Sequence, residues 1–128
     1  MLQTERVAFL FVDARDMYQN ALEMLEQDRL RNAADKAWCA TRRATDALIL
    51  ARTGEEPRTS SQTMRMIREL RRQDPSLEPL RVSYGHRQSF LRGAAFYDGI
   101  LEPADDIIAD VQETIEYIRD AEAMADTV

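Results

Sequence analysis

Two side chains that could perform acid–base chemistry on a phosphate lie close together in the sequence. His86 is the only histidine of the chain, and Arg81 precedes it by five residues. An imidazole titrates near neutral pH and a guanidinium holds phosphate oxygens, so such a pair can cut RNA without a metal ion. On an α-helix, five residues turn about 500°, which separates the two side-chain directions by about 140°. The pair therefore serves one site only on a distorted first turn or across two protomers; otherwise Arg81 is a surface arginine and His86 lies on a helix flank.

Four further residues are candidate ligand contacts. Arg87 and Arg92 close the basic part of the chain, residues 52–92, which carries 9 basic and 5 acidic side chains. Such a segment can contact a phosphate or an acidic partner, or it can lie beside an acidic helix of the same molecule. Tyr97 and Asp98 offer a hydroxyl and a carboxylate where a helix is expected to end. They can bind a nucleotide or another polar group, or Phe96 and Tyr97 can plug the end of the bundle while Asp98 and Gly99 form the turn.

Other kinds of catalytic or metal site find little support in the sequence. Acidic residues recur at steps of three and four near the C-terminal end, but no Glu-x-x-His pair accompanies them, which favours a solvated helix face over a divalent metal site. They are Asp106, Asp110, Glu113 and Glu116. The single cysteine, Cys39, excludes an intrachain disulfide and a cysteine-based metal site. With no glycine-rich phosphate loop and no Ser-His-Asp arrangement, we predict neither a metal nor a cofactor.

The elements that must position these residues are helices. Helix-forming residues dominate the composition, and the β-branched residues are too scattered to form strands. The clearest signal is a ridge of small residues within 29–53 that recur at steps of three and four. Its members are Leu30, Ala33, Ala37, Ala40, Ala44, Ala47 and Ala51. Because alanine lets a neighbouring backbone approach closely, the ridge predicts tightly packed helices.

The same periodicity predicts five helices in the whole chain. They are expected over about residues 4–28, 29–53, 61–73, 77–97 and 103–123. Gly54 suits a left-handed C-terminal cap of the second helix, and Ser60 or Ser61 can cap the third. Short connections favour neighbours that run in opposite directions, so the predicted fold class is all-α, an up-down bundle of four to five helices. We expect a single domain over residues 1–128.

Composition and charge limit the partners. The chain is 45% hydrophobic and 31% charged, as is usual for a globular protein, and its formal net charge of −6 argues against strong non-specific affinity for RNA. The negative charge is concentrated in residues 93–128, which carry 10 acidic side chains and 1 basic one. No apolar run has the length of a membrane span, and the N-terminal residues lack the features of a secretory signal. A cytoplasmic protein without membrane contact is therefore expected.

Three segments of the chain resemble the HEPN superfamily (higher eukaryotes and prokaryotes nucleotide-binding domain). They are residues 14–21 in the first helix, residues 37–48 in the second, and Phe96-Tyr97-Asp98-Gly99 before the last. The resemblance implies an up-down bundle of four or five helices that pairs as a symmetric homodimer. It also implies a basic cleft for RNA or a nucleotide beside the last long helices.

The ribonuclease branches of that superfamily carry an arginine and a histidine, four to six residues apart, just before the aromatic break. Here Ala94 or Ala95 stands where that histidine is expected, and the Arg81–His86 pair lies about two to three turns too early. The chain is therefore more similar to the small stand-alone HEPN-like proteins that lack the nuclease pair. Many of those are encoded beside a nucleotidyltransferase or another toxin–antitoxin partner.

These observations lead to three hypotheses about function. The first is a non-catalytic HEPN-like module, homodimeric, that binds a nucleotide, RNA or a partner protein. The second is a metal-independent endoribonuclease that uses Arg81 and His86 at the dimer cleft. The third is a scaffold protein without a small ligand.

Overall fold

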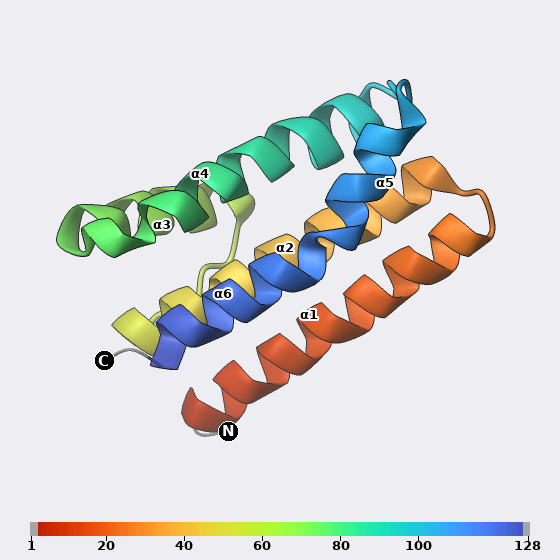
Figure 1. Ribbon diagram of the computed structural model, residues 1–128. Coiled ribbons are helices and arrows are strands. Elements are labelled where there is room, and N and C mark those ends of the chain that lie inside the picture. Colours follow the sequence, from red (N-terminus) through yellow and green to blue (C-terminus); the bar gives the residue numbers. More distant parts are fainter. Residues whose placement is uncertain (1–2, 127–128) are drawn as a thin grey trace.

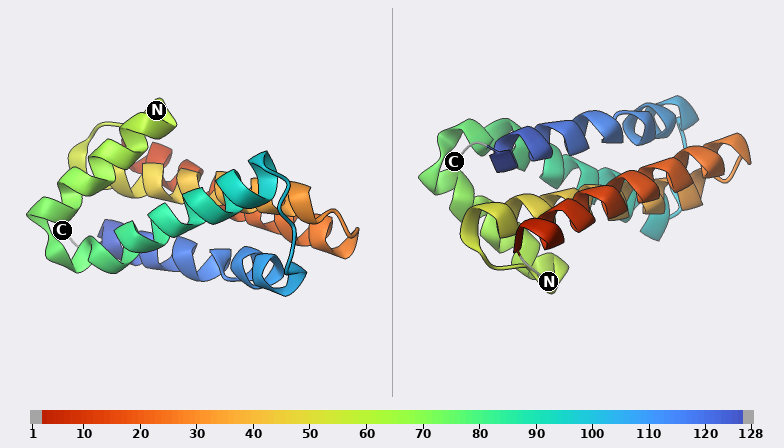
Figure 2. Two further views of the ribbon diagram at one scale, coloured as in Figure 1. Left: turned by 90° about the horizontal axis from the view of Figure 1, so that it is seen from above. Right: turned by 90° about the horizontal axis from the view of Figure 1, so that it is seen from below.

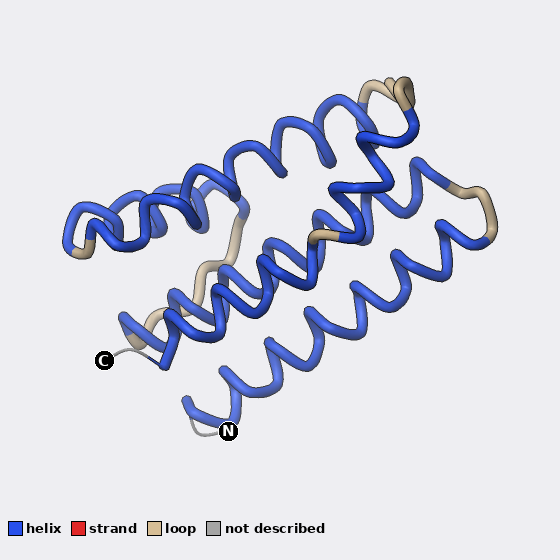
Figure 3. The backbone as a smooth tube through the Cα atoms, viewed as in Figure 1, coloured by secondary structure: helices blue, strands red, loops and turns tan. Residues whose placement is uncertain are grey.

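The computed structural model describes residues 3–126 and contains, over that range, helices and no strand (Figures 1 and 3). The α-helices are α1 (Gln3–Glu26), α2 (Leu30–Thr53), α3 (Ser60–Gln73), α4 (Glu78–Arg87), α5 (Ala104–Gln112) and α6 (Thr114–Asp126). A 3₁₀ turn, η1 (Pro75–Leu77), precedes α4, and a π-helix, η2 (Gln88–Tyr97), continues it. The prediction of an all-α fold is confirmed.

The long elements run up and down beside one another (Figures 1 and 2). α1 and α2 form an antiparallel hairpin, and Asp28 in its turn adopts the left-handed conformation at φ +59°. α4 and η2 form the next rod, and α5 with α6 returns in the opposite direction, placing α6 against α2. The shorter α3 packs beside α2 and the start of α4. The result is the predicted up-down helical bundle.

The ridge of small residues lies in the centre of the bundle, as predicted. The five alanines from Ala33 to Ala47 are completely buried, and only the two end members, Leu30 and Ala51, are partly exposed. Ala14 and Ala21 of α1 are buried as well. Small side chains on both members of the hairpin let the two backbones pack closely, because nothing longer than a methyl group separates them at these positions.

Of the two helix caps predicted from the sequence, one is confirmed and the other is wrong. Gly54 caps α2 in the left-handed conformation at φ +78°, and its N–H donates to the carbonyl of Leu50. The prediction that Ser60 or Ser61 caps α3 is wrong. Thr59 has the extended backbone of an N-cap, and its side chain accepts from the N–H of Gln62 at 3.1 Å. Ser60 is already helical.

The predicted fourth helix changes its type along its length. A single α-helix was expected over residues 77–97, but the turns after Arg87 are π-helical, with i→i+5 hydrogen bonds. Arg31 of α2 donates to the carbonyls of Phe96 and Tyr97 and so holds the C-terminal end of η2. The buried residues of η2 are Leu91 and Ala95, four positions apart on one face of the segment.

The predicted last helix is interrupted between α5 and α6. Thr114 Oγ1 and Nη2 of Arg87 both donate to the carbonyl of Asp110, at 3.2 and 2.9 Å. Tyr18 donates to the carbonyl of Gln112 at 3.3 Å. Side chains that enter the i→i−4 ladder in this way break the helix, and a periodicity pattern does not reveal them.

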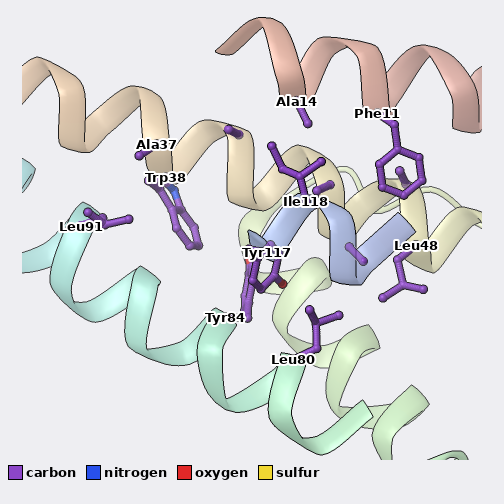
Figure 4. Packing of buried hydrophobic residues seen from close by; sticks show 14 of the residues in the cluster. Phe11, Ala14, Ala37, Trp38, Leu48, Leu80, Tyr84, Leu91, Tyr117 and Ile118 are labelled. Carbon is purple, nitrogen blue, oxygen red and sulfur yellow. The ribbon is translucent and has the colours of Figure 1, made fainter. Parts of the chain in front are cut away.

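The core collects side chains from several rods (Figure 4). Trp38 of α2 packs against Tyr84 of α4 with 5.3 Å between the ring centroids, while Phe11 and Ile118 approach from α1 and α6.

Within residues 3–126, no helix is both long and apolar enough to cross a membrane.

Candidate functional site

A cavity of about 500 Å³ lies between α4 and α6, and we call it the α4–α6 cavity. Leu80, Ser83 and Arg87 line it from α4, and Tyr117 and Met124 line it from α6. Three carboxylates, those of Glu113, Glu116 and Asp120, complete its charged surface. Its size lies in the range of about 300–1,000 Å³ that is typical of ligand pockets.

Among the described residues that line this cavity, Arg87 is the only cation, and it is 3% exposed. Its Nε donates to Thr41 Oγ1 at 2.9 Å, and its Nη2 donates to the carbonyl of Asp110 and to Thr114 Oγ1. Burial lowers the pKa of Arg87 from its ordinary value, since the nearby carboxylates compensate only part of the desolvation. Among residues 3–126, Nη1 of Arg87 makes no hydrogen bond, so its two N–H donors are left for a ligand in the cavity.

A buried tyrosine fixes the position of this arginine. The Cζ atom of Arg87 lies 5.9 Å from the ring centroid of Tyr117, and the phenol oxygen of that tyrosine is 2.6 Å from Thr45 Oγ1. Burial raises the pKa of Tyr117, so the hydroxyl stays neutral in the physiological range. Figure 4 shows Tyr117 between α2 and α4. Arg87 is therefore held at a fixed place between three helices.

His86 directly precedes Arg87 and lies on an adjacent face of α4. Its Nε2 is 3.0 Å from the carboxylate of Asp110, and its ring stacks on Phe90 with 5.6 Å between the centroids. The side chain is 59% exposed. Asp110 thus contacts His86 through its carboxylate and Arg87 through its backbone carbonyl, so the structure brings these two predicted residues together.

Arg81 lies elsewhere on α4. Its guanidinium donates to Glu78 at 2.8 Å, and the same carboxylate is 3.0 Å from Arg71 of α3. This hydrogen bond to Glu78 raises the pKa of Arg81. Arg81 therefore faces α3 whereas His86 faces α5, in agreement with the divergence expected from their spacing. One protomer does not bring Arg81 and His86 into a common cleft.

The remaining predicted residues lie outside the cavity. Arg92 is exposed on η2, and Tyr97 at the end of that segment is 73% exposed. The alternative in which Tyr97 plugs the end of the bundle is therefore wrong. Asp98 is also exposed, and its N–H donates to the carbonyl of Gly93 as part of the turn.

Several residues of the site were missed by sequence reasoning. Two buried threonines accept hydrogen bonds from Arg87, and they are Thr41 and Thr114. The ring of Tyr117 lies against the guanidinium of Arg87, and the hydroxyl of Tyr117 contacts the buried Thr45. Thr41 and Thr45 follow one another at a step of four beside the alanine ridge, and polar residues on a buried helix face are a signal that could have found them. No group of three or more metal-ligating side chains lies together in the described part of the chain.

Comparison with known proteins gives one finding. The model of the Archaeal PaREP1/PaREP8 family matches residues 11–81, which are 71 of the 128 residues. The match covers most of α1, all of α2 and α3, and the start of α4, so Arg87 and the whole of α6 lie beyond it. No curated protein and no solved structure matches the chain.

Proposed function

This chain belongs to the archaeal PaREP1/PaREP8 family, and from this premise and the geometry of the α4–α6 cavity we propose that it is a non-catalytic interaction module. The module binds a basic segment of a partner protein in the α4–α6 cavity. The observation that carries the proposal is the combination, in one cavity, of three carboxylates and a buried arginine with unused donors.

The charges of the cavity select the class of ligand. Glu113, Glu116 and Asp120 oppose the single positive charge of Arg87, so the cavity is net negative. A phosphate of RNA or of a nucleotide is repelled by such a surface, whereas a lysine or arginine side chain is attracted to it. The Nη1 donors of Arg87 fit a backbone carbonyl of the bound segment, which a peptide supplies at every residue.

The resemblance to the HEPN superfamily supports this proposal at the level of the bundle. An up-down arrangement with a break at residues 96–99 before the last helices is what the resemblance implies. Because of this resemblance, we would first test whether the protein forms a homodimer. We would then test whether it binds a nucleotidyltransferase or a toxin–antitoxin protein. Nucleotide or RNA binding in the α4–α6 cavity is not part of the proposal, because its carboxylates oppose it.

Catalysis is not part of the proposal either. Arg81 is held by Glu78 and His86 by Asp110, on different sides of the same rod. Incubation with RNA in the presence of a chelator is therefore expected to leave the RNA intact. Cleavage that disappears in a His86→Ala variant would instead support an endoribonuclease.

The binding proposal is tested with a labelled peptide of alternating lysine and alanine residues, followed by fluorescence anisotropy. We expect binding that weakens with salt, and at least tenfold weaker binding by a variant with Glu113→Gln and Asp120→Asn. A control variant with Glu102→Gln and Asp105→Asn removes the same charge from exposed positions in the loop before α5 and in its first turn, and it is expected to bind as the natural protein does. Equal loss in both variants, or preference for a glutamate–alanine peptide, would contradict the proposal.

A further inference from the structure

A second cavity, of about 420 Å³, lies between α2 and the loop of residues 54–59, and we call it the α2–loop cavity. Its lining includes three arginines, Arg42, Arg43 and Arg58, together with the buried carboxyl group of Asp46. Its apolar surface comes from Trp38, Met17 and Pro57. None of these residues lines the α4–α6 cavity.

Two short ion pairs, at 2.8 and 2.9 Å, neutralise part of the charge around this cavity. Nε of Arg43 is 2.9 Å from the carboxylate of Asp13. Glu56, which also lines the cavity, accepts two hydrogen bonds from Arg6, at 2.8 and 2.9 Å. These four side chains therefore leave no strong excess of either charge.

In the described part of the chain, neither of the other two arginines donates a side-chain hydrogen bond. Nε of Arg42 is buried and makes no hydrogen bond in the part of the chain that the structure describes. The carboxylate of Asp46 forms an ion pair with it at 3.8 Å, a distance too long for a hydrogen bond. Between residues 3 and 126, the side chain of Arg58 has neither a hydrogen bond nor an ion pair. The guanidinium of Arg58 is therefore unpaired among the described residues, and that of Arg42 has only a long ion pair, so positive charge remains at this cavity.

We propose that the α2–loop cavity binds a phosphomonoester, with the guanidinium groups of Arg42 and Arg58 on the phosphate and the organic part against Trp38 and Met17. Guanidinium groups match phosphate oxygens in geometry and keep their charge at all physiological pH values. The volume exceeds what a phosphate alone needs and leaves room for an organic body.

Asp46 does not prevent anion binding. Its Oδ1 accepts a hydrogen bond from Thr63 at 2.7 Å, and burial raises the pKa of Asp46 to about 6. The carboxyl group is therefore protonated more often than an ordinary aspartate in weakly acidic solution, and it opposes a phosphate less strongly.

The only tryptophan of the chain, Trp38, lines this cavity, so its fluorescence reports binding at the proposed place. The probes are adenosine monophosphate, inorganic phosphate and adenosine, titrated at pH 6. We expect the monophosphate to change the fluorescence at micromolar to low millimolar concentration, inorganic phosphate to bind more weakly, and adenosine not to bind. Stronger binding of inorganic phosphate than of the monophosphate would identify a free-anion site and overturn the phosphomonoester proposal.

A matched pair of variants completes the test. Arg58→Gln removes an exposed side chain, so the fold is retained, and we expect at least tenfold weaker binding of adenosine monophosphate. Arg65→Gln removes the same charge from an exposed position on α3 and is expected to change the affinity less than twofold. Absence of binding at millimolar concentration, equal binding by adenosine, or equal affinity of the two variants would overturn the proposal. Peptide binding in the α4–α6 cavity is measured separately, so either proposal can fail alone.

Discussion

At the scale of single residues, Arg87 shows how a buried cation can be kept without a carboxylate in direct contact. Its planar guanidinium donates hydrogen bonds to the hydroxyl of Thr41 on α2. It also donates to the hydroxyl of Thr114 and to the carbonyl of Asp110, at the break between α5 and α6. Hydrogen bonds from a charged group contribute about 1.5–3 kcal/mol each when they are lost singly from a folded protein. Arg87 therefore stabilises the junction of three helices as well as lining a cavity.

An Arg87→Lys variant tests this role. One ammonium group cannot reach three acceptors held in the geometry of a guanidinium, so we expect the free energy of unfolding to fall by about 2 kcal/mol. Urea denaturation followed by circular dichroism measures the change. The control is Arg92→Lys, at an exposed position on η2, with an expected effect below about 0.5 kcal/mol. Equal stability of the two variants would show that the guanidinium geometry of Arg87 does not contribute to the stability of the fold.

Asp46 predicts a pH dependence of stability that a single substitution removes. Its pKa is about 6 in the folded protein and 3.8 ordinarily, so the folded state holds the proton more strongly and stability falls as pH rises from about 4 to 6. The full effect is about 3 kcal/mol. Asp46→Asn keeps an oxygen for Thr63 and carries no charge, and we expect it to be more stable than the natural protein at pH 7.5 but not at pH 4. Parallel pH profiles of the two proteins would contradict this.

The sequence revealed individual site residues better than their partners. Residue type and the basic segment predicted Arg87, which lines the α4–α6 cavity, and His86, which lies beside it on α4. Thr41, Thr114 and Tyr117 were not, because a threonine on a helix commonly bonds to its own backbone, and only the fold shows that Arg87 reaches it. The contact between Asp110 and His86 joins residues 24 positions apart and has no local signal.

At the scale of elements, local patterns predicted the α-helical rods and missed the irregular turns within them. The ridge of α2 and the cap at Gly54 depend on residues close in sequence, so periodicity found both. The last carbonyls of η2 accept from Arg31, which lies about 65 positions away, and the carbonyls at the break after α5 accept from Arg87 and Tyr18. Such long-range hydrogen bonds cannot be derived from helix propensity.

Two glycines of the same rod are expected to respond in opposite ways to alanine. Gly99 has φ +69°, and an added Cβ atom would lie 3.4 Å from Arg31, so Gly99→Ala should cost about 1–2 kcal/mol of unfolding free energy. Gly85 is inside α4 with nothing within 4 Å of an added Cβ atom, so Gly85→Ala should stabilise by about 0.5–1 kcal/mol. Thermal unfolding of both variants measures this. A loss of stability in Gly85→Ala would mean that α4 needs flexibility at that point.

At the scale of the whole molecule, four of the five large apolar side chains exposed in residues 3–126 form two small groups. Phe9 and Val12 lie on the outer side of α1, at 49% and 56% exposure, while Tyr97 is the last residue of η2 and Ile100 follows it in the loop. Isolated apolar residues on a surface are common, but groups of them often mark contacts between proteins. Either group is a candidate face for the proposed homodimer.

Light scattering at micromolar concentration is expected to give the mass of two chains. Val12→Lys and Ile100→Lys each place a charge in one of these groups, and we expect one of the two variants to give the mass of a single chain. A single-chain mass for the natural protein would remove the homodimer from the proposal. Peptide binding in the α4–α6 cavity would still stand, because all its lining residues come from one chain.

The unequal burial of α2 and α3 has a consequence for how the molecule opens. Of the 24 residues of α2, 13 are buried, whereas α3 buries only Thr63, Ile67 and Leu70. Amide protons of α2 should therefore exchange with deuterium only through global unfolding. Those of α3 should exchange through local unfolding, in which α3 separates from the rest of the molecule. Proteases that sample such excursions should first cut the chain on either side of α3, leaving the α1–α2 hairpin as the last structure to come apart.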